Sequence, residues 1–229
     1  MRQRERAACI DAALVALVLC LNLPTPALAR SARPADFRAE PASTQVRLIA
    51  NWVTASGDNH DQPFVIVDKI AAKLFVFDRD GRLQEASAAL LGLARGDYSV
   101  PGIGTRKLAS ITPAERTTPA GRFEASLGHN LGERDVVWVD YKAAISLHRV
   151  VTDNPKERRI ERLATPTALD NRISYGCINV PAKFYDTVVR PAFTGTSGVV
   201  YILPEDISLA SAFPDFAKAQ VGPADALVP

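Results

Sequence analysis

The most informative stretch of the chain surrounds its last cysteine and reads Ile173-Ser174-Tyr175-Gly176-Cys177-Ile178-Asn179-Val180-Pro181. The two other cysteines, Cys9 and Cys20, fall in a segment with the features of an export signal, so we expect the mature chain to keep one unpaired thiol. In an oxidising compartment, a thiol without a disulfide partner is open to oxidation. Such a residue is either a small buried apolar side chain or a nucleophile. The Ser/Gly setting and His148 upstream favour the nucleophile.

The first 29 residues predict export. Arg2, Arg4 and Arg6 precede an apolar run at 12–21, and Ala27-Leu28-Ala29 offers the small residues that a signal peptidase reads. The run is too short to cross a bilayer comfortably. We therefore expect cleavage after residue 29, no transmembrane anchor in the mature chain, and a location in the periplasm or cell envelope. A retained membrane anchor is the alternative.

Composition excludes several classes of protein for the remaining residues. Without the three arginines and two acidic residues of the signal, the 27 basic and 25 acidic side chains of the full chain fall to nearly equal numbers. A nucleic-acid binder would carry a basic excess, so none is expected. The histidines, His60, His129 and His148, are scattered and show no metal-ligand spacing, so no metal is expected. The sequence leaves the oligomeric state open.

The pattern of apolar residues predicts a fold that is mainly β with a few helices. Strands are expected at 64–68, 73–78, 122–126, 136–139, 144–147 and 198–203, with turn residues between them. Helices are expected at 43–55, 156–163 and 183–189, and the segment 84–93 fits helix or strand. Many short strands indicate a β-sandwich or barrel-like core with helices at its edges. Trp52 and Trp138 are expected in that core.

Cys177 needs a neighbouring base, because a thiol with a pKa of about 8.5 is a few per cent thiolate at neutral pH. An imidazole can take the proton and then stabilise the thiolate as imidazolium. His148 ends a predicted strand and is the candidate base, with His129 in reserve; an ordinary strand-end histidine is the alternative. Gly176 leaves room for a substrate carbonyl, and the N–H groups of residues 175–177 are the expected oxyanion hole, unless this is a plain turn.

The segment Ser174-Tyr175-Gly176-Cys177-Ile178-Asn179 resembles the signature of the L,D-transpeptidase (YkuD-like) catalytic domain. In that family the nucleophilic cysteine follows Ser/Thr-His-Gly, and an upstream histidine acts as base. Thr118-Pro119-Ala120-Gly121-Arg122-Phe123 is similar to the family's Thr-Pro-x-Gly-x-Phe segment, and 65–68 with 74–77 to its opening hairpin. The resemblance covers roughly residues 63–203, so the expected organisation is a signal peptide at 1–29, a leader and short helix at 30–62, a catalytic domain at 63–204 and a tail at 205–229. We expect residues 30–41 to be flexible and the tail to be loosely held.

The resemblance also implies a reaction, in which the thiol of Cys177 attacks peptidoglycan stem tetrapeptides. It breaks the bond between meso-diaminopimelate and D-alanine, and an acyl-enzyme remains. An amine of a second stem then takes the acyl group and forms a 3→3 cross-link, without cofactor or metal. Other members use water or a protein lysine as acceptor. The implied process is cell wall biogenesis and the maintenance of cell shape.

Two features depart from the family pattern. Tyr175 stands where the family usually has a second histidine, and 25 residues separate His148 from Ser174, more than is usual. The extra length lies at 150–171 and is either a lid or substrate-facing loop, or a solvated charged helix. Four residues near the thiol are predicted to bind substrate: Tyr175, Ser174, Asn179 and Arg172. Arg172 would use its bidentate fork on a stem carboxylate.

Three other functions remain open from the sequence. Water as acceptor would make the protein an L,D-carboxypeptidase, and Tyr175 could make it a catalytically silent module that binds the cell envelope. A papain-like peptidase would need its cysteine near the mature N-terminus, which Cys177 is not. Thiol reactivity separates an activated cysteine from the silent module, because an imidazole lowers the pKa of the thiol.

Overall fold

The computed structural model describes residues 33–220, so the predicted export signal lies outside them. The strands are β1 (Phe64–Asp68), β2 (Lys73–Phe77), β3 (Leu83–Ala88), β4 (Leu91–Gly92), β5 (Gly121–His129), β6 (Asp135–Asp140), β7 (Ile145–Arg149), β8 (Arg172–Ser174), β9 (Ile178–Val180) and β10 (Ser197–Ile202). The α-helices are α1 (Thr44–Ser56), α2 (Arg159–Ala164), α3 (Ala182–Phe184), α4 (Arg190–Phe193), α5 (Leu209–Ala212) and α6 (Pro214–Gln220), and a π-helical turn, η5 (Tyr185–Val189), joins α3 to α4. Short 3₁₀ turns occupy η1 (Ile103–Thr105), η2 (Leu108–Ser110), η3 (Pro113–Glu115) and η4 (Pro155–Glu157). None of the helices at 33–220 is long and apolar enough to cross a membrane.

The described residues form one eight-stranded sheet and one two-stranded sheet. The large sheet has the order β3-β2-β1-β10-β5-β6-β7-β9 and is nearly closed into a barrel, while β4 pairs with β8. The β1–β10 and β7–β9 pairs are parallel, and the other pairs of the large sheet are antiparallel. The predicted sandwich or barrel-like class is confirmed. Helix and strand each account for 29% of the described residues, so the helices contribute more than the sequence pattern indicated.

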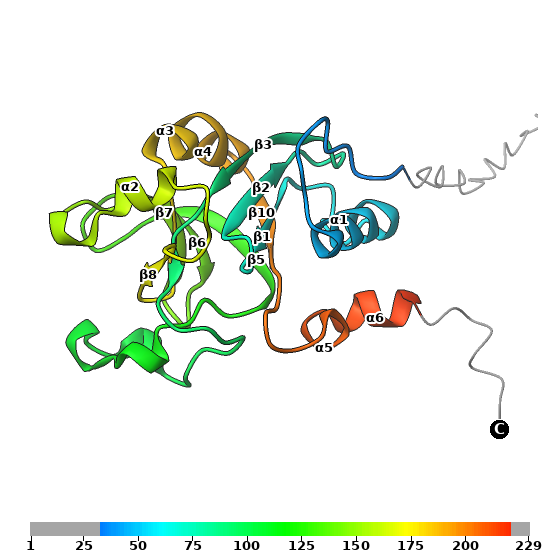
Figure 1. Ribbon diagram of the computed structural model, residues 1–229. Coiled ribbons are helices and arrows are strands. Elements are labelled where there is room, and N and C mark those ends of the chain that lie inside the picture. The colour runs from blue at the N-terminus through cyan, green and yellow to red at the C-terminus, as the bar shows by residue number, and fades with distance from the viewer. Residues whose placement is uncertain (1–32, 221–229) are drawn as a thin grey trace, which may run out of the picture. The chain divides into compact units, whose positions relative to one another are not determined.

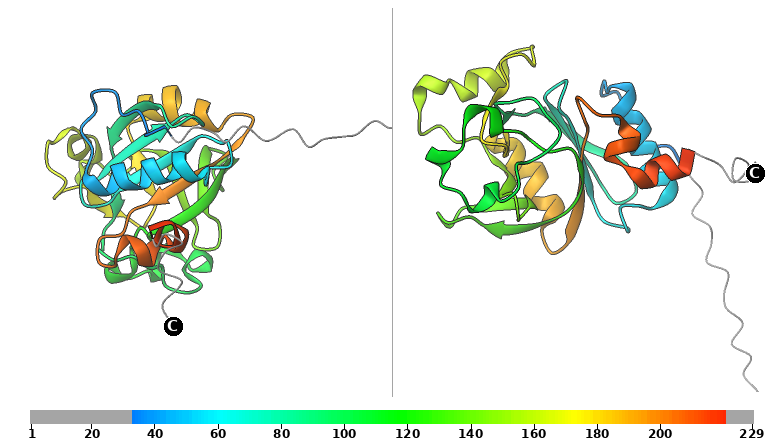
Figure 2. Two further views of the ribbon diagram at one scale, coloured as in Figure 1. Left: turned by 90° about the vertical axis from the view of Figure 1, so that its right-hand side faces the viewer. Right: turned by 90° about the horizontal axis from the view of Figure 1, so that it is seen from below.

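Helices cover both faces of the sheet, which is why its central strands are apolar on both sides. On β1, Val65 and Val67 pack in one core cluster, together with Phe193 of α4. Phe64 and Ile66 point to the opposite face, where they pack with α1, α5 and α6. The right-hand view of Figure 2 shows α1 and α6 on one side of the sheet and the α3–α4 segment on the other. This continuous burial explains why the sequence of β1 lacks the alternation of a half-exposed strand.

Several predicted elements are confirmed. The helix predicted at 43–55 is α1, and Ser43 caps it by accepting a hydrogen bond from the N–H of Val46 at 3.3 Å. The ambiguous segment 84–93 supplies strands β3 and β4. Trp52 is buried in the core as predicted, whereas the prediction for Trp138 is wrong: its side chain is partly exposed and contacts the exposed ring of Tyr141, 5.0 Å away between ring centroids.

The structure differs from the expected loose ends. Phe37, within the expected flexible leader, is 4% exposed and packs edge-on against Phe75 and Phe77. Phe213 and Phe216, within the expected loose tail, are buried in the same cluster, and Figure 1 shows α5 and α6 on the α1 side of the sheet. A few large aromatic side chains are enough to hold short polar segments, because each buries a large apolar area.

Candidate functional site

The parallel pairing of β7 with β9 brings the predicted base and nucleophile together. The register places Leu147 opposite Ile178 and His148 opposite Asn179. Cys177 immediately precedes β9, so it lies beside Ser146 of β7 although it is far from that strand in sequence. Residues 150–171, which include η4 and α2, form the connection between the two halves of the site.

Strand alternation sorts the side chains of β7 and β9 into a core face and a reactive face. Ile145 and Leu147 of β7 are buried in the same cluster as Ile178 and Val180 of β9. The intervening positions therefore point away from that cluster, and they are Ser146, His148, Cys177 and Asn179. Polar residues share one face here because every second residue of these strands is needed for the core.

His148 is held in one tautomer by the backbone. Its Nδ1 lies 2.7 Å from the carbonyl oxygen of Arg149, and a carbonyl can only accept a hydrogen bond, so Nδ1 carries the proton. In the neutral ring, Nε2 is then the nitrogen with a free lone pair. This is the protonation state that a general base requires.

Cys177 is half-buried and has its pKa shifted downward. Burial by itself raises the pKa of this thiol, because it disfavours the charged thiolate. The hydrogen bond and charge of His148, followed by hydrogen bonds from the side chain and backbone of Ser146, outweigh burial and bring the pKa below its ordinary value. The Ser146 Oγ lies 3.6 Å from the Cys177 Sγ, and the Ala144 carbonyl oxygen is also 3.6 Å from it. His148 is thus the histidine beside the thiol, and the reserve candidate His129 lies at the end of β5.

Ser174 shapes the loop that carries Cys177. Its Oγ donates to the carbonyl oxygen of Cys177 at 2.6 Å and accepts from the N–H of Gly176 at 3.0 Å. Both hydrogen-bonding functions of the hydroxyl are used inside the loop, so its predicted contact with substrate finds no support in this arrangement. The same bond removes the N–H of Gly176 from the expected oxyanion hole, which leaves those of Tyr175 and Cys177.

Gly176 is needed because the loop lies too close to its neighbours for any side chain. Its φ is +127°, and a Cβ there would lie 2.6 Å from the carbonyl oxygen of Thr117 and 2.7 Å from the Cδ1 of Ile145. Its own carbonyl oxygen accepts from Thr118 Oγ1 at 2.8 Å, and that hydroxyl also accepts from the N–H of Gly92 at 2.8 Å. The Thr-Pro segment therefore contributes to the site by fixing the backbone before the nucleophile.

Tyr175 and Asn179 each contact an arginine. The guanidinium carbon of Arg116 lies 3.9 Å from the centroid of the Tyr175 ring, a cation–π contact. Asn179, 1% exposed, donates through Nδ2 to the Cys177 carbonyl at 3.2 Å and accepts from Arg159 Nη1 at 2.9 Å. Arg159 belongs to the 150–171 connection, and its side chain is 12% exposed. The solvated charged helix is therefore wrong for this residue, which reaches the loop of the nucleophile.

Arg172 binds a carboxylate through both terminal nitrogens of its guanidinium, but this carboxylate is that of Glu205 in the same chain. Its Nη1 and Nη2 contact the Glu205 carboxylate at 3.2 and 2.6 Å, and Nη2 also donates to the Lys69 carbonyl at 2.9 Å. The Glu205 side chain is 1% exposed. An internal partner thus already occupies its guanidinium, and the contact of Arg172 with a stem carboxylate stays a prediction without support from this arrangement.

The Arg172–Glu205 pair is part of a buried ionic network. Lys69 Nζ donates to Asp97 Oδ1 at 2.6 Å, to the Gly96 carbonyl at 2.7 Å and to the Thr118 carbonyl at 3.0 Å. Burial opposes ionisation of Asp97, but the Lys69 ammonium and the N–H groups of residues 205–207 lower its pKa to about 2. Through Thr118, this network is joined to the loop of Cys177.

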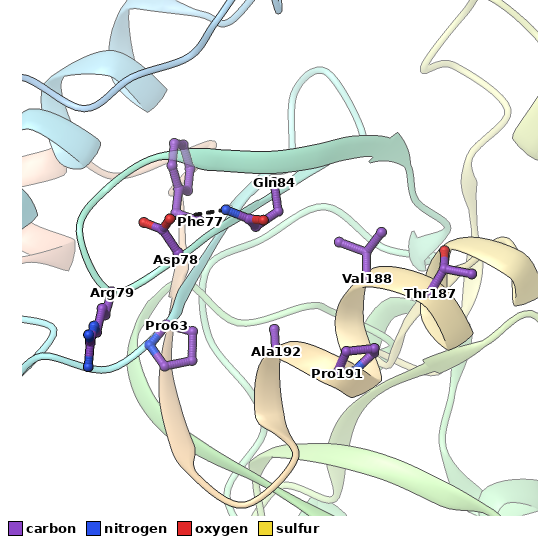
Figure 3. Close-up of a pocket in the computed structure, with 9 residues that line it drawn as sticks. All are labelled: Pro63, Phe77, Asp78, Arg79, Gln84, Thr187, Val188, Pro191 and Ala192. Carbon is purple, nitrogen blue, oxygen red and sulfur yellow. Dashed lines mark hydrogen bonds between the residues drawn. The ribbon is translucent and has the colours of Figure 1, made fainter.

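A separate hollow of about 590 Å³ lies between the β1–β3 strands and the η5–α4 segment. Figure 3 shows Phe77, Asp78 and Gln84 on the strand side and Val188, Pro191 and Ala192 on the helical side. None of its lining residues belongs to the loop of Cys177. Within residues 33–220, no group of three or more His, Cys, Asp or Glu side chains is placed to hold a metal ion.

No protein-family model and no curated protein matches the sequence. Solved structures with a similar fold include the helical cell shape determining protein Pgp2 from Campylobacter jejuni, with 12% identity over 72% of this chain and 58% of that one and a TM-score of 0.42. An L,D-transpeptidase from Enterococcus faecium has 14% identity over 62% and 50% with a TM-score of 0.34, and L,D-transpeptidase LdtMt1 in complex with imipenem has 14% over 62% and 58% with a TM-score of 0.34. The chain thus spans between 50% and 58% of the length of these three chains.

Three residues of the site were not identified from the sequence: Ser146, Lys69 and Arg159. Ser146 could have been found, because it lies two positions before His148 on the same face of a predicted strand. Lys69 and Arg159 gave no such signal. Their partners are remote in sequence, and a basic residue in a polar stretch is usually solvated.

Proposed function

We propose that the protein is an exported cysteine acyltransferase that carries out L,D-transpeptidation on peptidoglycan stem tetrapeptides through a Cys177 acyl-enzyme. The observation that carries the proposal is the thiol–imidazole pair, in which His148 lowers the pKa of Cys177 while its Nδ1–H is fixed on the Arg149 carbonyl. The substrate class follows from the resemblance of residues 174–179 and 118–123 to the L,D-transpeptidase signature. The proposed location is the periplasm or cell envelope.

In the first half-reaction, Nε2 of His148 takes the thiol proton and the sulfur attacks the carbonyl carbon of the third stem residue. The new oxyanion would be stabilised by the backbone N–H groups of Tyr175 and Cys177. The C–N bond then breaks, and the amine of D-alanine leaves with the proton held by His148. A thioester on Cys177 remains.

In the second half-reaction, the side-chain amine of a second stem attacks the thioester. His148 removes a proton from the attacking nitrogen, the C–S bond breaks, and the sulfur recovers the proton. The product is a 3→3 cross-link, and the enzyme returns to its starting state. Both halves use one imidazole, first as base and then as acid, which requires that its tautomer be restored after each transfer.

The test is mass spectrometry of purified tetrapeptide muropeptides incubated with the wild-type protein, Cys177→Ala and His148→Ala. We expect loss of D-alanine and a new dimer with the wild type and neither product with the variants. Denatured wild-type protein taken during turnover should carry a thioester adduct on the peptide that contains Cys177. Tripeptide without dimer would replace transpeptidation by hydrolysis, and absence of both products from a folded wild type would refute the proposal.

A further inference from the structure

We propose that Arg159 of the 150–171 connection is a positioning residue, which holds the Cys177 carbonyl through Asn179 and so fixes the direction of the nucleophile. The effect on thiol reactivity stands on its own, whereas the effect on turnover rests on the proposed function.

The contacts form a short chain from α2 to the nucleophile. Arg159 Nη1 donates to Asn179 Oδ1 at 2.9 Å, and Asn179 Nδ2 donates to the Cys177 carbonyl oxygen at 3.2 Å. A second bond from Arg159, through Nε, goes to Glu157, which anchors the guanidinium within the connection. A charged donor on Oδ1 fixes the flip of the carboxamide, because the opposite flip would set Nδ2 against the guanidinium.

Hydrogen bonds hold both peptide groups that flank the Cα of Cys177. Thr118 Oγ1 holds the Gly176 carbonyl at 2.8 Å, and Ser174 with Asn179 holds the Cys177 carbonyl at 2.6 and 3.2 Å. The orientation of these two groups sets φ and ψ of Cys177, and therefore the direction of its Cα–Cβ bond. Because His148 sits on a different strand, this direction decides whether the sulfur faces the imidazole.

Asn179 is 1% exposed, so its carboxamide depends on protein partners for its orientation. Without Arg159, Oδ1 loses its charged partner, and the side chain is free to turn away from the Cys177 carbonyl. We expect the thiol to spend less time against His148 and to react more slowly. The connection between base and nucleophile would then contribute to the chemistry itself and would not merely join two strands.

Arg162 provides a matched control, because it is the same residue type one turn further along α2. Its hydrogen bonds go to the carbonyls of Glu157 and Asp170, so it braces the connection without contacting Asn179. The experiment measures iodoacetamide labelling of Cys177 from pH 5 to pH 9 in Arg159→Gln, Asn179→Ala, the double variant and Arg162→Gln. Circular dichroism confirms that each variant is folded.

We expect Arg159→Gln and Asn179→Ala each to slow labelling at pH 7 by about fivefold and to move the pH midpoint upward. The double variant should label no more slowly than either single variant, since both substitutions interrupt the same chain of hydrogen bonds from Arg159 to the Cys177 carbonyl. Arg162→Gln should label like the wild type. Effects of Arg159 and Asn179 that multiply, or an equal effect of Arg162→Gln, would overturn the proposal.

A second readout addresses turnover with the tetrapeptide. Arg159→Gln should lower kcat for D-alanine release several-fold with KM unchanged, because the residue acts on the direction of the thiol and not on substrate binding. A raised KM with normal kcat would overturn the positioning role. If the wild type releases no D-alanine, the proposed function fails, and the labelling experiment still decides the role of Arg159.

Discussion

The Lys69→Met substitution would remove a positive charge from a side chain that has 0% exposure. Lys69 and Arg172 face the buried carboxylates of Asp97 and Glu205, and the mostly exposed Arg95 also lies 3.7 Å from Glu205, so the substitution leaves Asp97 without its buried cation. Breaking a buried ion pair in this way costs about 3–5 kcal/mol. Methionine has a similar volume, so no large cavity adds to that figure. Domain stabilities are about 5–15 kcal/mol, and the loss should therefore be obvious in an unfolding curve.

Lys73→Met is the matched control, because it makes the same change four residues along the chain. Lys73 pairs with Glu40, but the two side chains are 28% and 34% exposed. Partly exposed pairs of this kind contribute about 0–1 kcal/mol. Urea unfolding at pH 7, followed by circular dichroism and compared at equal m-values, measures both losses. A loss for Lys69→Met no larger than that for Lys73→Met would refute the reasoning.

The pH dependence of the same variant gives a second check. In the wild type the pKa of Asp97 is lowered to about 2, so its ionised form stabilises the fold above the unfolded pKa, and this contribution is lost as the pH falls through 2. Without the Lys69 ammonium, burial of Asp97 is less well opposed and its pKa rises. In the variant, Asp97 therefore takes up a proton and loses its buried charge at a pH where Asp97 of the wild type is still ionised. The difference in free energy of unfolding between the wild type and Lys69→Met should shrink by about 1 kcal/mol from pH 7 to pH 3. A difference that stays constant over this range would contradict the conclusion that Lys69 keeps Asp97 ionised.

Three further predictions concern the loop, the thiol and the tail. Gly176→Ala should lower the free energy of unfolding, measured in urea, by about 2–4 kcal/mol and should abolish rapid thiol labelling, because its Cβ would lie 2.6 Å from a carbonyl oxygen. Gly57→Ala is the control: Gly57 also has a positive φ, but nothing lies within 4 Å of its Cβ position, so the loss should be about 1–2 kcal/mol. The labelling rate of Cys177 should rise with pH around a midpoint below that of an ordinary thiol, and His148→Ala should move the midpoint above it, since burial remains when the imidazole is gone. Phe216→Ala should cost about 3 kcal/mol in thermal or urea unfolding, whereas a loosely held tail would show no change.

Local pattern predicted most of the strands and the first helix, because those segments bury continuous or periodic apolar faces. The strands at 64–68 and 73–78 and the helix at 43–55 are examples. Strands β8 and β9 were not predicted, since each has three residues and too few positions to show a period. They are held by partners elsewhere in the chain, and they frame the loop of Cys177. The most important local geometry was therefore the least visible in the sequence.

The same distinction separates the site residues that sequence could predict from those it could not. The pairing of His148 with Cys177 was predicted from the motif and the chemistry of thiols; the β7–β9 register sets the two segments side by side, and the catalytic roles remain a proposal. Ser174 and Arg172 were both predicted to bind substrate, Arg172 because its fork suits a carboxylate. In the structure both groups are already engaged, one by its own loop and the other by Glu205. Sequence identifies the bonding capacity of a side chain, and only tertiary contacts decide where that capacity is used.

Tyr175 concentrates the proton chemistry of this site on a single imidazole. The family pattern has a histidine at this position, whereas here a phenol ring stacks under the guanidinium of Arg116 at 3.9 Å. The contact uses the face of the phenol ring, and a guanidinium carries donors only, so neither group supplies a second imidazole-like base. Ser146 can stabilise the thiolate by a hydrogen bond, but a hydroxyl is no base at this pH. In the proposed mechanism His148 therefore serves both half-reactions, and the hydrogen bond from its Nδ1 to the Arg149 carbonyl restores the same tautomer after each one.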